Sequence, residues 1–201
     1  MQVKKEEVKN NILDKAKQEF LEKGFQKSSL RSIAARAGVT KGNIYNYFGS
    51  KDELFEALVV DTIDKILDYD DSDYGYIFDD DIELENKSIQ EFYDYVRFIE
   101  SNRDEMMLLF FSADGSKYSN FRQELINSYK KSSKAFYEEM KTKTNKEYIA
   151  SDLFISSCSA LYISFIETIL LHKPEDEKLD SYIREMATFV NSGTKAIVRR
   201  S

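Results

Sequence analysis

Apolar residues recur at three- and four-residue steps along most of the chain, the spacing that places side chains on one face of a helix. The first such run spans residues 8–20, and Glu19 falls on its polar face together with several lysines. Gly24 predicts the end of this helix. Two shorter runs follow over 30–37 and 41–48, each ending at a glycine. Helix, turn, short helix, tight turn and short helix is the layout of a small three-helix DNA-binding unit.

Side chains that can cap helices stand at the breaks between these runs. Ser28 and Ser29 are candidates for the N-cap of the second helix, and Thr40 for that of the third. Ser50 followed by Glu53 matches a capping box, in which two side chains satisfy backbone amides at the start of a helix. The sequence therefore predicts a long fourth helix directly after the third.

The remainder of the chain is also helical in pattern. An acidic, tyrosine-rich stretch over 68–85 has no helical period and predicts a loop, and Pro174 separates the last two helices. With 7 glycines and 1 proline, the chain has too few turn residues for a hairpin-rich sheet. We therefore expect an all-α fold. The apolar or helical segments beyond the loop span 89–101, 104–111, 118–140, 148–172 and 177–198.

The net charge of −7 argues at first against a nucleic-acid partner, because binding to phosphates needs clustered lysine and arginine. The charge is unevenly distributed, however. Residues 1–51 carry 11 basic and 5 acidic residues, a net charge of +6, and the remaining residues carry −13. The basic N-terminal segment is attracted to DNA and the acidic remainder is repelled from it, so the total charge does not exclude DNA as a partner.

The third short helix carries the candidate chemistry. When Ile44 and Phe48 face inward, the residues left outward can contact a DNA groove: asparagine pairs with adenine, and lysine and tyrosine hold phosphate oxygens. The outward residues are Lys41, Gly42, Asn43, Tyr45, Asn46 and Tyr47.

The run SSLRSIAARAGVTKGNIYNYFGSKDELF, residues 28–55, resembles the helix-turn-helix signature of the TetR family of bacterial transcriptional regulators. Ser32 stands where aspartate is common and Asn46 where histidine is frequent, which leaves the base preference open. The resemblance implies a homodimer whose two units read successive major grooves of a palindromic operator. Combined with the outward face, it gives as DNA-binding candidates Ser28, Ser29, Thr40, Lys41, Gly42, Asn43, Tyr45, Asn46, Tyr47 and Lys51.

Some of these residues also have a purely structural interpretation. Tyr45 or Tyr47 can pack against the first helix, and Thr40 can serve only as a cap. The resemblance implies three parts: a helix-turn-helix DNA-binding domain over 1–49, a connecting helix over 50–67, and an effector-binding and dimerisation domain over 68–201.

The last two helices have broad apolar faces with small residues among them, which suits a four-helix dimer interface. An internal core seam remains the alternative. The interface candidates are Cys158, Leu161, Phe165, Ile169, Met186, Val190 and Gly193.

The central segments are rich in aromatic residues and methionine, which line adaptable apolar cavities but also fill ordinary cores. By resemblance, we expect an apolar or aromatic small-molecule effector among them. The ligand-binding candidates are Phe92, Tyr95, Met106, Phe110, Phe136, Phe154 and Tyr162.

Other chemistry has little support. The single cysteine, Cys158, cannot form an intramolecular disulfide, and no signal peptide is evident, so we expect a soluble cytoplasmic protein. His172 lacks partners at metal-ligand spacing, and no catalytic constellation appears. We therefore expect no metal, no cofactor and no enzymatic activity.

The sequence predicts a ligand-responsive DNA-binding regulator, in the first place a repressor, although repression and activation are not separable from the residues. Two alternatives stay open: a constitutive DNA-binding regulator without an effector, and an all-helical enzyme whose N-terminal unit only docks partners.

Overall fold

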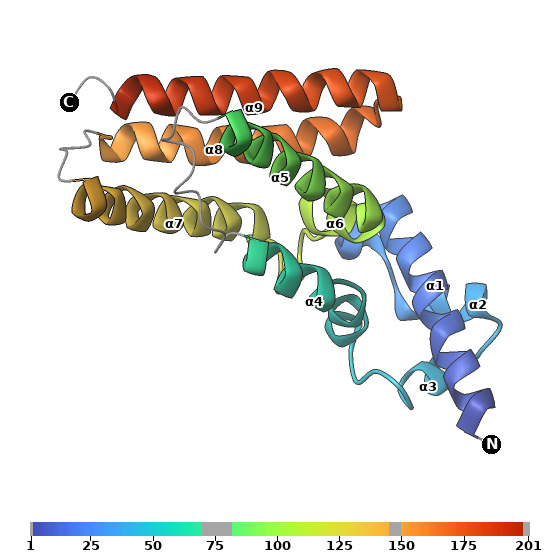
Figure 1. Ribbon diagram of the computed structural model, residues 1–201. Coiled ribbons are helices and arrows are strands. Elements are labelled where there is room, and N and C mark those ends of the chain that lie inside the picture. Colours follow the sequence, from blue (N-terminus) through green and yellow to red (C-terminus); the bar gives the residue numbers. More distant parts are fainter. Residues whose placement is uncertain (1, 70–81, 145–149, 199–201) are drawn as a thin grey trace. The chain divides into compact units, whose positions relative to one another are not determined.

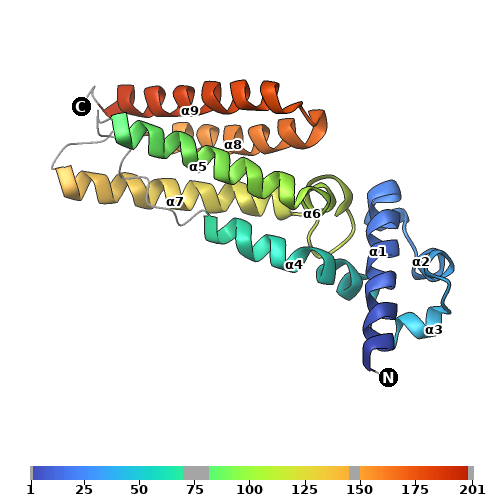
Figure 2. The ribbon, with the colours of Figure 1, turned by 45° about the vertical axis from the view of Figure 1, so that its right-hand side comes forward.

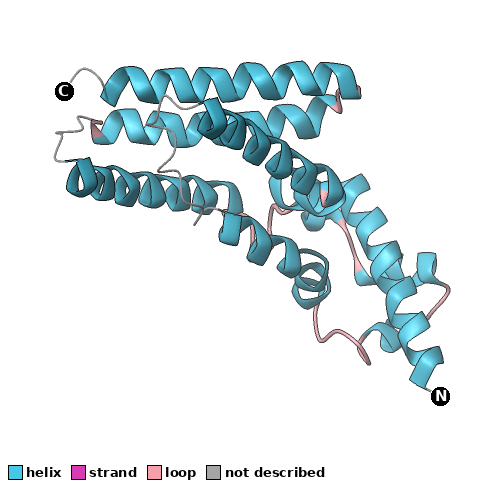
Figure 3. Cartoon of the chain, in the orientation of Figure 1, coloured by secondary structure: helices cyan, strands magenta, loops and turns pink. Residues whose placement is uncertain are grey.

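The computed structural model describes residues 2–69, 82–144 and 150–198, and all regular elements in these ranges are helices (Figure 3). The expected all-α fold is confirmed. In chain order the elements are α1 (Gln2–Lys27), α2 (Leu30–Ala37), α3 (Lys41–Ile44), α4 (Lys51–Tyr69), α5 (Ile82–Ser101), α6 (Arg103–Met107), the π-helical turn η2 (Leu108–Ser112), α7 (Phe121–Thr144), α8 (Asp152–His172) and α9 (Asp176–Val198).

Several boundaries differ from the sequence-based expectation, among them the starts of α5 and α8. α5 begins at Ile82, inside the stretch expected to be a loop, and residues 70–81 of that stretch lie outside the described residues. α8 begins at Asp152 rather than at residue 148, because the Ser151 hydroxyl accepts a hydrogen bond from the Phe154 amide and caps the helix there.

The expected caps account for the ends of the short N-terminal helices. Ser29 caps α2 by accepting a hydrogen bond from the Ser32 amide, and Gly38 ends α2 with a left-handed backbone, φ 67°. α1 extends past Gly24 to Lys27, but the backbone of Gly24 is not helical, with φ 74° and ψ 161°, so the chain bends there. The expected break is therefore present as a kink inside α1.

The capping box at the start of α4 forms with one change. The Glu53 amide donates to the Ser50 hydroxyl at 3.0 Å, as expected. The Glu53 carboxylate accepts from the Gly49 amide at 2.7 Å instead of from Ser50. Both contacts fix the start of α4 directly after the α3 turn.

The chain divides into two compact units, each made of two stretches of sequence. The first unit contains residues 1–65 and 102–122, and the second contains 66–101 and 123–201. From the sequence, residues 102–122 were expected to belong to the effector-binding and dimerisation domain over 68–201. In the structure α6 and η2 from this stretch pack against α1.

Phenylalanines form the centre of the first unit. Phe20, Phe25 and Phe55 are buried, and their ring centroids lie 5.2–5.7 Å apart. Tyr118, from the stretch 102–122, adds its ring at 6.2 Å from that of Phe55. The second stretch of the unit thus contributes to the core that supports the helix-turn-helix.

Polar contacts hold the stretch 102–122 in the same place. Lys17 of α1 pairs with Asp104 and Glu105, each at 3.3 Å. The Tyr118 hydroxyl donates to the Glu56 carboxylate of α4 at 3.1 Å. This stretch therefore contacts both helices that frame α2 and α3.

The second unit is a helical bundle in which α5, α8 and α9 run side by side (Figure 1 and Figure 2). Its core contains aliphatic side chains from all three helices, among them Ile99, Ile163 and Ile183, each at most 3% exposed.

Candidate nucleic-acid interface

α3 is shorter than the expected eight residues and continues as a hydrogen-bonded turn. The Asn46 amide donates to the Asn43 carbonyl and the Tyr47 amide to the Ile44 carbonyl, at 3.1 and 2.9 Å. Ile44 and Phe48 are buried, as their spacing predicted. The residues around them are less buried, with Lys41, Gly42, Tyr45 and Asn46 exposed and Asn43 and Tyr47 half-buried.

Two lysines lie over the tyrosines of this segment. The Lys41 ammonium is 5.6 Å from the centre of the Tyr45 ring, and the Lys5 ammonium, from α1, is 5.9 Å from that of Tyr47. Tyr45 is 48% exposed, so it does not pack into the unit, whereas Tyr47 is partly covered. Cations combined with aromatic hydroxyls form a surface that can bind phosphates and bases.

Thr40 has the capping role that was left open for it. Its hydroxyl accepts a hydrogen bond from the Asn43 amide at 3.1 Å, while the residue stays exposed. Capping consumes one lone pair and leaves the O–H available as a donor. The structure is therefore compatible with both roles, and a phosphate contact by Thr40 stays a prediction.

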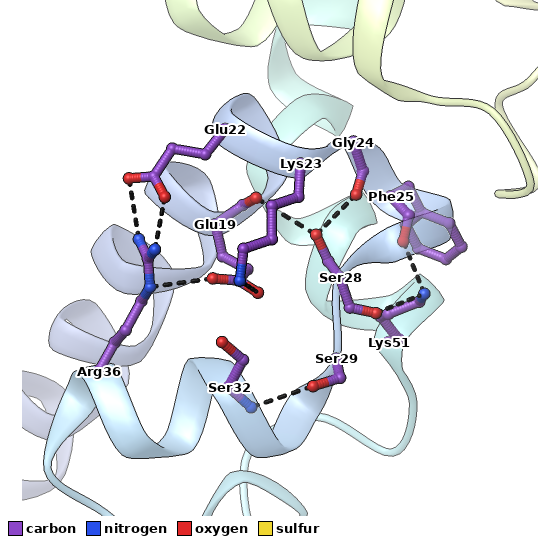
Figure 4. Close-up of polar contacts among 10 residues, drawn as sticks. All are labelled: Glu19, Glu22, Lys23, Gly24, Phe25, Ser28, Ser29, Ser32, Arg36 and Lys51. Carbon is purple, nitrogen blue, oxygen red and sulfur yellow. Dashed lines mark hydrogen bonds and ion pairs between the residues drawn. The ribbon is translucent and has the colours of Figure 1, made fainter.

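Ser28 has a different environment from the one expected. It is 5% exposed, and its hydroxyl lies 2.6 Å from the Gly24 carbonyl and 3.2 Å from the Glu19 carbonyl (Figure 4). The cap of α2 is Ser29 alone. Because the Ser28 hydroxyl is buried against the end of α1, we correct its assignment from phosphate contact to internal brace.

Lys51 is also engaged within the protein. Its ammonium donates to the carbonyls of Phe25 and Ser28, at 2.7 and 3.1 Å, and lies 4.0 Å from the centre of the Phe25 ring (Figure 4). Burial lowers the pKa of Lys51, against a smaller opposing effect of Asp52. These contacts join the start of α4 to the end of α1, so the structure shows a bracing role for this residue.

A Lys51→Met variant tests that role. We expect the free energy of unfolding to fall by about 1–3 kcal/mol, because two carbonyls lose their charged donor. If the ammonium only braces the fold, the dependence of DNA affinity on salt concentration stays unchanged, since no phosphate contact is lost. Urea unfolding and affinity titrations between low and moderate salt measure the two effects.

Lys65→Met, on an exposed lysine of the same helix, is the matched control and should leave both quantities unchanged. A salt dependence reduced by about one counterion in Lys51→Met would instead show that Lys51 also holds a phosphate.

Several further cations belong to the candidate surface, although the motif did not indicate them. Other bases of the N-terminal stretch are paired with carboxylates, including Lys15, Lys17, Lys23 and Arg36. Between residues 5 and 41, the bases that make neither an ion pair nor a hydrogen bond within the described chain are Lys5, Lys9, Lys27, Arg31 and Lys41. These charges can be counted in the sequence, but only the fold shows which of them are paired with carboxylates.

Three of the ligand-binding candidates line a small cavity in the second unit. It measures about 30 Å³ and is lined by α5, α8 and α9. Phe92, Tyr95 and Tyr162 lie in its wall. Met106 and Phe110 belong to the first unit, and Phe136 and Phe154 do not line the cavity. These four candidates lie outside this cavity, and a contact between them and a ligand stays a prediction.

Some dimer-interface candidates line the same cavity. Phe165, Ile169 and Met186 are among its wall residues, and Ile169 is 3% exposed, so it is corrected from interface to core. Leu161 and Gly193 are exposed, whereas Cys158 and Val190 are half-buried. Among the side chains of α8 and α9 that the structure describes, the most exposed apolar ones were missed: Leu153, Leu171 and Phe189, which are 81%, 60% and 61% exposed.

No group of three or more potential metal ligands occurs among the described residues. His172 is exposed at the end of α8. The acidic, tyrosine-rich stretch over residues 68–85 lies mostly outside the described residues.

Comparison with known proteins identifies the helix-turn-helix. The family model "Bacterial regulatory proteins, tetR family" matches residues 12–58, from within α1 to within α4. Solved structures of TetR-type regulators match along almost the whole chain. The chain carries the helix-turn-helix domain of the TetR family over residues 12–58.

Among curated TetR-type proteins, the transcriptional repressor BepR of Brucella suis is 43% identical over 53 residues, which cover 26% of this chain and 25% of BepR. The chain thus matches only about a quarter of the length of this curated relative. The TetR family is one of regulatory proteins and not of enzymes, in agreement with the sequence-based expectation.

Two solved TetR-type structures extend the comparison to the whole fold. A transcriptional regulator of Aquifex aeolicus aligns with a TM-score of 0.60 and 20% identity, over 91% of this chain and 99% of that one. PfmR of Thermus thermophilus aligns with a TM-score of 0.60 and 14% identity, over 90% of this chain and 97% of PfmR. At these identities the likeness concerns the fold alone.

Proposed function

We propose that this protein is a DNA-binding transcriptional regulator that binds a palindromic operator as a homodimer. The observation that carries the proposal is the surface of α3 and its turn, where Lys41 lies over the 48% exposed Tyr45 and Lys5 of α1 lies over Tyr47. BepR, which matches this segment, is named a transcriptional repressor, so repression is the mode we propose.

The contacts within the first unit support a division of roles. Lys41, Asn43, Tyr45 and Asn46 supply side chains for the major groove. Lys5, Lys27 and Arg31 add charge for the phosphates on either side, and Ser29, Thr40, Gly42 and Tyr47 complete the proposed contact set. Phosphate contacts position such a unit, and base contacts give it specificity.

Selection of bound duplexes from a random DNA library tests the proposal. We expect an enriched palindrome, because a symmetric dimer presents two identical units. Lys41→Ala and Tyr45→Ala together should lower the affinity for the enriched duplex by about a hundredfold, since each contact of this kind contributes about 1–3 kcal/mol. Lys131→Ala, on an exposed lysine of α7, controls for the loss of one charge. Absence of any palindrome, or binding unchanged in the double variant, would overturn the proposal.

The apolar surface of α8 and α9 supports the homodimer. A stretch of 18 residues within α8 has a mean hydropathy of 1.7, yet only 33% of this stretch is buried in the structure. By length and composition it could also cross a membrane, a test that core and interface helices of soluble proteins pass as well. Leu153, Leu161 and Leu171 lie on one helical stripe with Ser157 and Ser164 between them, and this alternation suits close packing against a second copy.

We propose a small apolar or aromatic effector that binds between α5, α8 and α9. The cavity wall is made almost entirely of apolar surface from aliphatic, aromatic and methionine side chains. A second candidate function, a constitutive regulator without an effector, is favoured by the cavity's volume, because about 30 Å³ holds only one or two water molecules. The two differ in whether aromatic compounds release the protein from its enriched duplex.

A further inference from the structure

A carboxylate is buried beneath the helix-turn-helix. Glu19 was expected on the polar face of the first helix, but in the structure it is 1% exposed, because α2 crosses over it. A buried carboxylate is costly unless it is paired and hydrogen-bonded. Glu19 therefore needs its partners in place for this packing of α2 on α1.

Those partners come from both helices (Figure 4). Lys23, one turn along α1, pairs with one carboxylate oxygen at 2.8 Å, and Nε of Arg36, from α2, pairs with the other at 2.9 Å. The two terminal nitrogens of Arg36 donate to both oxygens of Glu22. We call these four residues the Glu19 clamp.

Electrostatics keep the clamp charged. Burial alone raises the pKa of Glu19, but the hydrogen bond from Lys23, the nearby Ser32 and the charges of Lys23 and Arg36 outweigh it and hold the pKa below its ordinary value. The guanidinium of Arg36 meets two carboxylates three residues apart on α1, a forked geometry that a lysine cannot reproduce.

The clamp acts on the end of α2 that leads into α3. Next to Arg36, the Ala37 carbonyl accepts a hydrogen bond from Asn11 of α1 at 2.8 Å. Two residues further on, the Val39 amide returns to the Ala34 carbonyl at 3.0 Å, so the turn toward Thr40 is tight. Whatever fixes the direction of α2 on α1 therefore also fixes the placement of α3.

We infer that Glu19 is a positioning residue for DNA recognition, which holds Arg36 so that α2 and α3 present the recognition surface in a single orientation. The inference rests on the proposed DNA-binding function. It also means that Arg36 is withheld from the phosphates, although it lies within the basic N-terminal stretch. Loss of the clamp should harm specific binding and spare non-specific binding.

Glu19→Gln and Arg36→Lys test this inference in the full-length protein. The probes are the duplex enriched by the wild type and a scrambled duplex of equal length. For each variant we expect affinity for the enriched duplex to fall about tenfold, in the range of coupling between contacting residues. Affinity for the scrambled duplex should stay equal or rise in Glu19→Gln, because the unit gains one positive charge. Arg36→Lys preserves the charge, so its effect isolates the geometry of the fork.

Arg97→Lys is the matched control, because Arg97 is exposed and its ion pair is with Asp94 of its own helix. An equal loss on both duplexes, or no loss on either, overturns the inference, since the first indicates general unfolding and the second no role. A wild type that enriches no duplex overturns the proposed function instead. In that case hydrogen exchange of residues 39–48 in the DNA-free protein decides the inference: faster exchange in Glu19→Gln supports it, and unchanged protection overturns it.

Discussion

Replacement of Phe55 by alanine should destabilise the protein by about 3–5 kcal/mol, the range for removing a fully buried aromatic ring. Phe55 is 0% exposed and contacts the rings of Phe20, Phe25 and Tyr118, with centroids at 5.2, 5.4 and 6.2 Å. These three rings come from α1 and from the stretch 102–122, so the cavity left by alanine lies where α1, α4 and that stretch meet. Urea unfolding followed by circular dichroism measures the loss.

Phe111→Ala provides the comparison for the same chemical change. Phe111 lies in the same unit but is 41% exposed, and its ring contact is with neighbouring Phe110 at 6.1 Å. Its truncation should cost about 1 kcal/mol or less, because little apolar area returns to water. Equal losses in the two variants would show that the aromatic cluster does not hold the unit together.

If the proposed homodimer forms through α8 and α9, replacement of Phe189 by arginine should convert it into monomers and reduce affinity for the proposed palindrome by at least about a hundredfold. Phe189 is 61% exposed on α9, so arginine is tolerated in the folded monomer but is costly at an apolar interface. A monomer loses the gain in affinity that comes from binding two half-sites at once, about a hundredfold or more. Sedimentation velocity and binding to the enriched duplex measure the two effects.

Ser101→Arg adds the same side chain at an exposed position at the end of α5, and should leave both the mass of the particle and its DNA affinity unchanged. A Phe189→Arg protein that remains dimeric would contradict the placement of the interface on this face. A wild-type protein that is monomeric would contradict the homodimer itself.

The helix-turn-helix was predictable because its signals are local. Caps such as Ser29 and Thr40 and the left-handed Gly38 act within four residues, and the inward spacing of Ile44 and Phe48 is a property of one turn of helix. The same locality explains why the outward set could be named from sequence. The environments of Ser28 and Lys51 could not be predicted from local signals, because their partners are backbone carbonyls at the end of α1.

Long-range packing could not be predicted from these patterns. Glu19 lies on the polar face of α1 by periodicity, and only the crossing of α2 buries it. Ile169 fits the apolar seam of α8 as well as Leu161 does, yet it is buried while Leu161 is 37% exposed. Periodicity identifies an apolar stripe, but the neighbouring helix determines which edge of the stripe remains in contact with water.

Because residues 102–122 are part of the first unit, they affect when this unit can fold during synthesis on the ribosome. Synthesis proceeds from the N-terminus, and domains generally fold as their sequence emerges. Here Phe55 and Glu56 receive the ring and the hydroxyl of Tyr118 only after α5 has been translated. The nascent DNA-reading helices therefore stay incomplete through much of elongation, and a contiguous N-terminal fragment ending at Lys65 does not contain all the residues of its own core.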